Sequence, residues 1–190
     1  MENTTTALMG NTISAFIGVI LGFSLTICWD LYKNQRKFKD LIWLVLNEME
    51  ANLKRMDDVI ENLPEGIKVQ VEKNGDSVSL DNSEIETLPW SFPKPYITEA
   101  WHTFILSGFA SKLPKDTLLN LYKAYDQIHS INFLGDISVS LFQILSQQNR
   151  LDNKTNKIFD KFCRIGTLAQ QFIARKQSKQ VIEDLKKLLK

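Results

Sequence analysis

Few residues of this chain belong to the types that perform catalysis, and the sequence places them far apart. Its two histidines, His102 and His129, are each expected alone on a separate helix. A catalytic histidine works together with a nucleophile or with a carboxylate that orients its imidazole ring. Because no such constellation is evident, we interpret both as structural or surface histidines.

The cysteines and the adjacent acids offer no clearer site. Cys28 ends a long apolar run and Cys163 lies in a helical pattern, so a disulfide between them is not expected. Neither has a CxxC partner or a histidine at metal-ligand spacing. Cys28 is either a lipid-facing side chain or an acylation site at a membrane surface. Asp57 and Asp58 are neighbours, and neighbouring side chains diverge around a helix.

The common nucleotide-binding and hydrolytic motifs are missing from the sequence. It contains no phosphate-binding GxxxxGK(S/T) loop, no GxGxxG, no HExxH and no GxSxG. We therefore predict that the protein is not an enzyme, with no catalytic, cofactor-binding or metal-ligating residues and no small-molecule substrate. An enzyme with an unfamiliar site is the alternative.

The feature that stands out instead is an uncharged run from Asn3 to Trp29, almost continuously apolar from Ile13 onward. A helix rises 1.5 Å per residue, so about 20 apolar residues cross a hydrocarbon core of about 30 Å. The sequence therefore predicts a transmembrane helix over residues 12–32, preceded by an extracytoplasmic tail over residues 1–11.

The charges beside this run predict its orientation. Only Glu2 precedes it, whereas Lys33, Arg36, Lys37 and Lys39 follow it. A cleavable signal peptide has a basic segment before its apolar core, so an uncleaved anchor is favoured. Basic residues gather on the cytoplasmic side of membrane helices. We expect a cell-membrane protein with its N-terminus outside and its C-terminal domain in the cytoplasm.

Small residues form a row along the predicted span. Ser14, Gly18, Gly22 and Thr26 recur every four residues and therefore share one side of a helix. The GxxxG pair lets two helix backbones approach closely, so that van der Waals packing can drive their association. The row predicts self-association or pairing with another membrane helix.

Charge is distributed unevenly along the rest of the chain. Residues 64–99 contain three lysines and seven acidic residues, whereas residues 150–190 contain eleven basic and four acidic residues. One interpretation is charge complementarity between solvated faces of the same domain. The other is a basic surface that lies near anionic lipid or an acidic partner.

Residues 33–63 are expected to form a juxtamembrane helix with a heptad stripe. Its apolar side chains recur in alternating steps of four and three: Ile42, Leu46, Met49, Leu53, Met56, Ile60 and Leu63. Such a stripe packs within the chain's own bundle or pairs in a parallel coiled coil. We favour the bundle.

Residues 64–97 are predicted to form a connector that contains a small β-hairpin. Alternating apolar residues on both sides of Asn74 and Gly75 favour the hairpin, with a loop as the alternative. The segment 88–96 interleaves prolines with aromatic residues, which excludes a regular helix. We expect it to lie across the chain's own core, rather than to present an extended peptide to a partner.

Residues 98–190 are predicted to form a helical bundle. Thr98 is expected to cap a short helix that Gly108 ends, and Pro114 to open the next. Gly135-Asp136 is expected to kink or interrupt that helix, and Ser178 to cap a final segment. The lysines of this final segment could rest on an anionic bilayer, but we favour a segment that closes the bundle.

One part of this region resembles a known class of proteins. The pattern consists of Ala100-Trp101, Ser107-Gly108, Leu113-Pro114 and, after a long helix, Ile131-Asn132. Over Tyr96 to Asn132 the chain resembles uncharacterised small prokaryotic single-pass membrane proteins with an α-helical cytoplasmic domain. The resemblance implies an all-helical core and supplies no activity and no catalytic residue.

The sequence thus predicts a mainly α protein: an N-terminal transmembrane helix that continues into a cytoplasmic helical bundle with a small β-hairpin insertion. The predicted function is that of a membrane-anchored, non-enzymatic interaction or scaffold protein. Its expected partners are membrane lipid and either a protein or a second copy of the chain, and no nucleic acid is expected. The alternative is an oligomeric membrane effector that perturbs the bilayer through its GxxxG span.

Overall fold

The computed structural model of the chain describes the backbone of residues 2–63, 69–71, 78–80, 95–147 and 153–190. Side chains are described for residues 17–63, 95–140, 143–144 and 165–190. The chain divides into two compact units, Met1–Leu41 and Ile42–Lys190, which are described separately below.

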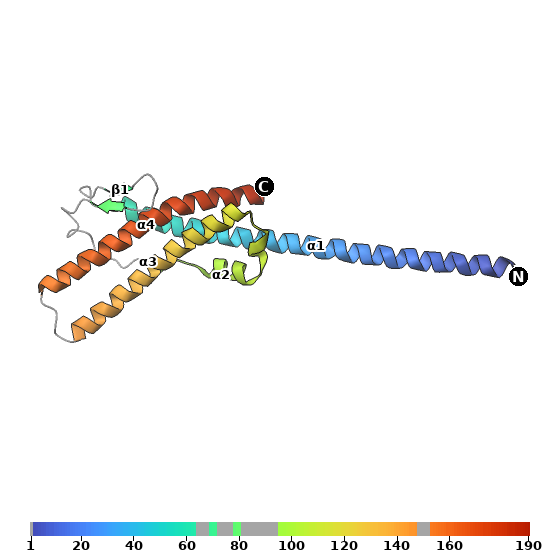
Figure 1. Ribbon diagram of the computed structural model, residues 1–190, viewed down its shortest axis with the longest axis horizontal. Coiled ribbons are helices and arrows are strands. Elements are labelled where there is room, and N and C mark those ends of the chain that lie inside the picture. The colour runs from blue at the N-terminus through green and yellow to red at the C-terminus, as the bar shows by residue number, and fades with distance from the viewer. Residues whose placement is uncertain (1, 64–68, 72–77, 81–94, 148–152) are drawn as a thin grey trace. The chain divides into compact units, whose positions relative to one another are not determined.

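The fold is mainly α, as the sequence predicts. Its elements, labelled in Figure 1, are α1 (Glu2–Glu61), β1 (Val69–Val71), β2 (Val78–Leu80), α2 (Glu99–Leu106), the 3-10 helix η2 (Phe109–Lys112), α3 (Lys115–Gln147) and α4 (Asn153–Leu189).

The first unit consists of the N-terminal part of α1. Its large apolar side chains are exposed: Ile17, Val19, Ile20, Leu21, Phe23, Leu25, Ile27, Trp29, Leu31 and Tyr32. None of the helices, as far as the structure describes their residues, is both long and apolar enough to cross a membrane. The transmembrane helix over residues 12–32 stays a prediction, and its first side chains, those of residues 12–16, lie outside the described part.

The second unit contains the rest of α1, and here the heptad stripe is buried within the chain. Ile42, Met49 and Met56 are at most 1% exposed, and Leu46 is also buried. The later members of the stripe, Leu53, Ile60 and Leu63, are half-buried. The stripe therefore packs inside the chain's own bundle, which is the alternative that we favour from the sequence.

Helix α2 is short: it begins after Thr98 and ends just before Gly108. Trp101 and Phe104 are buried, and Gly108 adopts a left-handed φ of 75° after the C-terminus of α2. Glycine takes this conformation without the steric cost that a Cβ atom brings. Thr98 is the N-cap residue, but its side chain makes no capping hydrogen bond.

Helix α3 is unbroken, so the predicted interruption at Gly135 is wrong. Glycine inside a helix costs about 1 kcal/mol relative to alanine, which packing on both sides can offset. The buried residues Ile131 and Ser138 flank Gly135 on the core side of α3. The Ser138 hydroxyl also donates a 2.7 Å hydrogen bond to the carbonyl of Leu134.

Helix α4 is also unbroken, and Ser178 is not the cap of a separate segment. Ser178 lies within α4, fully buried beside the buried residues Ala174 and Val181. Its hydroxyl has no hydrogen-bond partner in the described part of the chain, so it does not serve as a cap. The buried residues Ile182 and Leu185 then continue the same face of α4. This segment closes the bundle, as expected from its apolar stripe.

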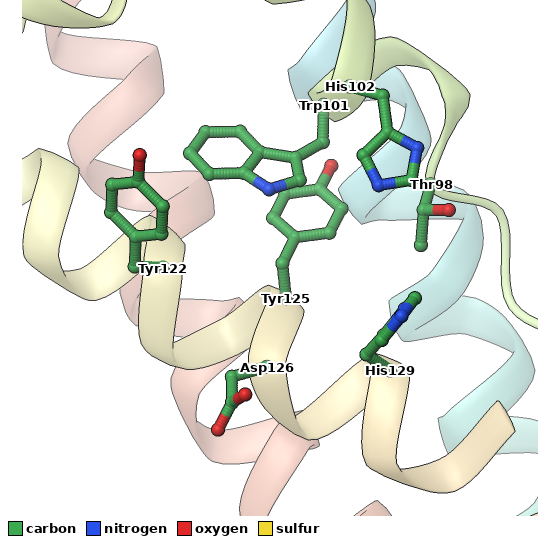
Figure 2. Close-up of a pocket in the computed structure, with 7 residues that line it drawn as sticks. All are labelled: Thr98, Trp101, His102, Tyr122, Tyr125, Asp126 and His129. Carbon is green, nitrogen blue, oxygen red and sulfur yellow. The ribbon is translucent and has the colours of Figure 1, made fainter. Parts of the chain in front are cut away.

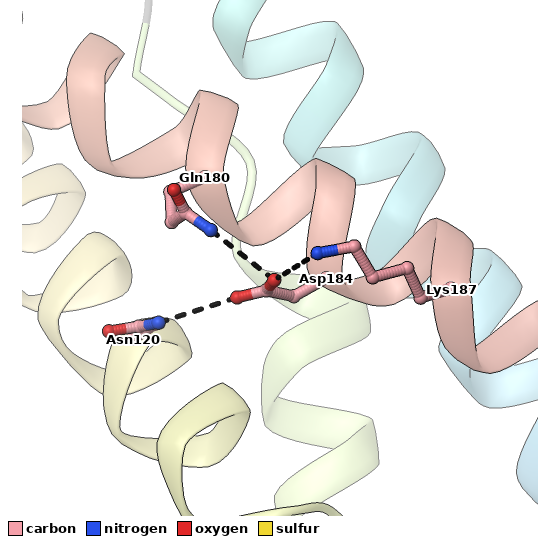
Figure 3. A network of polar contacts seen from close by, with 4 residues as sticks. All are labelled: Asn120, Gln180, Asp184 and Lys187. Carbon is pink, nitrogen blue, oxygen red and sulfur yellow. Dashed lines mark hydrogen bonds and ion pairs between the residues drawn. The ribbon is translucent and has the colours of Figure 1, made fainter.

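Helices α3 and α4 run antiparallel along each other (Figure 1). Polar contacts join them at the end of the bundle where α3 begins and α4 ends. Asp184 accepts hydrogen bonds from Asn120 of α3 and from Gln180 and Lys187 of its own helix, at 3.3 to 3.4 Å (Figure 3). These contacts fix which turns of the two helices face each other.

Ion pairs also join α4 to α1, and their order along the two helices shows the direction of α4 relative to α1. Arg175 pairs with Asp57, and Lys186 pairs with Glu50 at 2.8 Å. Since the later residue of α4 meets the earlier residue of α1, these helices are antiparallel. Both pairs join a basic residue of the C-terminal region to an acid of α1.

The strands β1 and β2 pair antiparallel, with Val69 opposite Leu80 and Val71 opposite Val78. They lie where the sequence predicts a hairpin, and residues 72–77 between them are outside the described residues. Most of the proline and aromatic segment, residues 88–94, is also outside them. Its last residue, Tyr96, is buried in the bundle core.

Candidate functional site

The candidate site lies between α2 and α3, and an extended segment of backbone leads into it. Asn132 of α3 accepts a hydrogen bond from the Tyr96 N–H at 2.8 Å and donates one to the Tyr96 carbonyl at 3.0 Å. Asn52 of α1 pairs in the same two-way manner with Ile97, at 2.9 and 2.7 Å. The side-chain amide of each asparagine thus bonds both the N–H and the carbonyl of one residue, as the backbone of a neighbouring β-strand does. Together the two asparagines hold the segment between α1 and α3.

A further contact reinforces this segment. Arg55 of α1 donates a 2.9 Å hydrogen bond to the carbonyl of Pro95. Burial removes the hydroxyl of Tyr96 from water and raises the pKa of this residue to about 12, an effect that the nearby Arg55 partly opposes. The hydroxyl has no hydrogen-bond partner among the described residues.

Glu48 of α1 supplies the cap that Thr98 does not. Its carboxylate accepts hydrogen bonds from the backbone N–H groups of Ala100 at 2.8 Å and Trp101 at 3.2 Å. These N–H groups belong to the first turn of α2, which has no intrahelical acceptors for them. A carboxylate at this end also interacts favourably with the helix dipole. One buried side chain of α1 therefore fixes the start of α2.

The same carboxylate binds α3. The hydroxyl of Tyr125 donates a 2.6 Å hydrogen bond to Oε1 of Glu48. Burial, followed by this hydrogen bond and the charge of Glu48, raises the pKa of Tyr125 far above its ordinary value. Tyr125 thus remains a neutral donor, and Glu48 connects α1, α2 and α3 at one point.

Aromatic rings pack above this connection. Trp101 of α2 stacks on Tyr125 of α3 with the ring centroids 4.8 Å apart and the planes 5° from parallel. Tyr122 packs against Trp101 in a T-shaped contact, with the ring centroids 5.1 Å apart and the ring planes at 85°. Such pairs add about 0.5 to 1.5 kcal/mol to the energy of burial. The three rings form a fixed wall, because Glu48 also binds the hydroxyl of Tyr125 and the backbone N–H of Trp101.

A pocket of about 200 Å³ opens beside this wall. Thr98, Trp101 and His102 line it from the α2 side, and Tyr122, Tyr125, Asp126 and His129 line it from α3 (Figure 2). Figure 2 shows the two imidazole rings on one side of the hollow and Tyr122 on the other. Trp101 and Tyr125 are buried, whereas His102, Tyr122, Asp126 and His129 are exposed.

The two histidines lie together in this pocket, which the sequence did not predict. Their ring centroids are 6.5 Å apart, with the planes at 82°. No hydrogen bond of either imidazole to a described residue is present. The sequence does place Asp126 three residues before His129, on the same side of α3. That spacing is the local signal that could have pointed to a site.

The part of the chain with described side chains contains no group of three or more histidine, cysteine or acidic residues that could hold a metal ion. Cys28 is a free, exposed thiol. The side chain of Cys163 is outside the described residues.

The residues predicted to form a helix-association face belong to the other unit. A Cβ atom at Gly18 or Gly22 would meet nothing within 4 Å, so this side of α1 is open. The Thr26 hydroxyl donates a 2.9 Å hydrogen bond to the Gly22 carbonyl. The side chain of Ser14 is outside the described residues. Association through this face stays a prediction.

The membrane-proximal basic residues lie on the same helix. Lys33, Arg36, Lys37 and Lys39 are all exposed. The ammonium group of Lys33 lies 5.4 Å from the centroid of the Trp29 ring, and Trp29 stacks on Tyr32 at 5.9 Å. Aromatic and basic residues therefore occur together at the end of the uncharged run.

No protein-family model matches this chain, and no curated protein or solved structure is significantly similar to it.

Proposed function

We propose that the chain is a membrane-anchored, non-enzymatic interaction or scaffold protein whose helical bundle lies in the cytoplasm. The observation that carries the proposal is the uncharged run from Asn3 to Trp29. In the first unit its described apolar side chains are exposed, as they would be toward lipid. Exposing such a run to water would be costly, since each buried methylene is worth about 0.8 kcal/mol.

The orientation follows from the exposed basic residues Lys33, Arg36, Lys37 and Lys39. Basic residues beside a membrane helix favour the cytoplasmic side. The ring of Trp29 and the hydroxyl-bearing ring of Tyr32 suit the boundary between hydrocarbon and water. We therefore assign residues 1–11 to the outside and the bundle to the cytoplasm, with the small β-hairpin as an insertion in it.

Exposed apolar side chains on the bundle support an interaction role. Leu106 is 87% exposed, Phe133 61% and Trp43 56%. Two of these three residues are aromatic, and aromatic side chains are enriched at protein interfaces. The proposed partner is a protein that binds the bundle at the membrane.

Protease protection tests the orientation. Protease added to sealed cells should leave the bundle intact, and digestion should follow once the membrane is permeabilised. Digestion of the bundle in sealed cells would reverse the proposed topology. A cytoplasmic protein and an externally exposed protein, followed in the same samples, control for leakage and for protease activity.

A second candidate function is an oligomeric membrane effector. The open sides of Gly18 and Gly22 favour it, because close backbone approach requires that nothing cover these positions. Gly18→Ile with Gly22→Ile should abolish self-association in a membrane reporter assay. Ser24→Ile adds a similar side chain on another side of the helix and should leave association unchanged. Equal association of both variants would remove this candidate.

A further inference from the structure

The pocket between α2 and α3 gathers polar groups that have no partner in the described part of the chain. They are the carboxylate of Asp126, the imidazoles of His102 and His129, and the hydroxyl of Thr98. The contacts made by these residues are backbone hydrogen bonds and the contact between the two imidazole rings. These groups are therefore available to bind a ligand.

The wall behind these groups is held in place before any ligand arrives. Trp101 and Tyr125 stack, and Glu48 binds the backbone of the first and the hydroxyl of the second. Tyr122 makes a T-shaped contact with Trp101 and keeps about half of its own surface exposed. A preorganised wall reduces the entropy lost when a ligand binds.

The carboxylate of Asp126 makes a cation the favoured ligand of the pocket. Asp126 is the only acidic residue among the seven described residues that line it, and these seven include no lysine or arginine. Neutral imidazoles and hydroxyls can accept hydrogen bonds from a cationic donor. Aromatic faces attract cations through the negative potential over the ring.

The volume of the pocket suits a small ligand group. Pockets for drug-sized ligands have volumes of about 300 to 1,000 Å³. The volume here, about 200 Å³, is smaller and suits the end of one side chain. A guanidinium group is planar, stacks on aromatic rings and binds a carboxylate through two parallel hydrogen bonds.

We propose that this pocket binds the guanidinium group of an arginine side chain on a partner protein, with Asp126 as its counter-ion and Tyr122 as its stacking surface. The proposal rests on the interaction role proposed above for the source of the arginine. The chemistry of the pocket itself does not depend on the membrane anchor.

Because the chain has only two histidines, and both line the pocket, their imidazole Cε1–H resonances report on this site alone. The experiment titrates the detergent-solubilised full chain with arginine blocked at both ends, and in parallel with blocked citrulline. Citrulline keeps the shape of arginine without the charge. Both histidine signals should shift saturably with arginine, and citrulline should bind at least about tenfold more weakly. Equal binding of citrulline would overturn the proposal.

Matched variants test the counter-ion. Asp126→Asn should weaken arginine binding by about tenfold or more, because it removes the charge that pairs with the guanidinium. Asp136→Asn changes an exposed acid of the same helix outside the pocket and should leave binding within about twofold. Unchanged binding by Asp126→Asn, with the amide spectrum of the folded bundle preserved, would overturn the assignment.

A third titration identifies the source of the guanidinium. Free arginine also carries an α-ammonium and an α-carboxylate, and the described residues that line the pocket include no second acid, lysine or arginine to pair with them, so free arginine should bind no more tightly than blocked arginine. Tighter binding of free arginine would assign the pocket to a small metabolite and overturn the role of a partner side chain. Membrane extraction of the same chain tests the proposed anchor separately, so failure of one proposal is distinguishable from failure of the other.

Discussion

The hydroxyl of Tyr125 donates a 2.6 Å hydrogen bond to Oε1 of Glu48, and the same carboxylate accepts the backbone N–H groups that begin α2. Three helices therefore depend on one buried acid. The position of every residue that lines the pocket from α2 depends on this connection.

The two buried tyrosines should respond differently to loss of the hydroxyl. Tyr125→Phe leaves Glu48 with one donor fewer and should lower the free energy of unfolding by about 1 to 3 kcal/mol. Tyr96→Phe removes a buried hydroxyl that has no partner within the described ranges, so it should be neutral or slightly stabilising. Urea unfolding followed by tryptophan fluorescence measures both. Equal losses in the two variants would contradict the role of the Glu48 hydrogen bond.

Replacing Glu48 itself should loosen the start of α2. Glu48→Gln puts an amide where the carboxylate accepts from two N–H groups and a hydroxyl, so we expect a loss of about 1.5 to 3 kcal/mol. Hydrogen exchange at the Ala100 and Trp101 amides should accelerate. Glu50→Gln removes only an exposed ion pair with Lys186 and should cost at most about 1 kcal/mol. Slow exchange retained at both amides in Glu48→Gln would refute the cap.

Each asparagine that holds the extended segment should protect one particular amide. Asn52→Leu should accelerate hydrogen exchange at Ile97, and Asn132→Leu at Tyr96, because each substitution removes the acceptor of that N–H. Asn62→Leu, which changes an exposed asparagine just after α1 that donates a hydrogen bond to the Asp58 carbonyl, should affect neither amide. Equal hydrogen-exchange rates of the Tyr96 and Ile97 amides in all three variants would contradict the pairing of Asn132 with Tyr96 and of Asn52 with Ile97.

Alkaline pH should destabilise the bundle through its buried tyrosines. Tyr96 has a folded pKa of about 12 against an ordinary value of 10.0, so above pH 10 the unfolded chain loses a proton that the folded chain keeps. The stabilisation is therefore complete below pH 10 and is lost as the pH rises toward 12, by about 2 to 3 kcal/mol. Unfolding free energies measured between pH 9 and about pH 11 should fall less steeply in Tyr96→Phe. An equal slope in that variant would contradict the burial of the hydroxyl.

Local patterns in the sequence predict much of the bundle. The spacing of Ile42, Met49 and Met56 gives the buried side of α1. Gly108 ends α2 because the left-handed φ is a local property of glycine. By contrast, whether a helix breaks at Gly135 or at Ser178 depends on its packing against other helices. The residue types alone predicted breaks at both positions, and the structure contains neither.

The candidate site could not be predicted in the same way. Glu48 caps a helix 52 residues away, and Thr98, the local candidate, makes no such bond. His102 and His129 look isolated in the sequence because α2 must first fold against α3 to bring them together. Only the tertiary arrangement creates the pocket, so its chemistry has no signature in a short motif.

The most direct test of the central claim, that residues 12–32 anchor the chain in a membrane, is extraction of cell membranes with alkaline carbonate. We predict that the chain stays in the membrane pellet, and that Leu21→Arg with Phe23→Arg releases it, since each arginine at the centre of a span costs about 2.5 to 3.5 kcal/mol. Leu106→Arg with Phe133→Arg makes the same change at exposed positions of the bundle and should leave the chain in the pellet. Recovery of the unaltered chain in the carbonate supernatant would contradict the account.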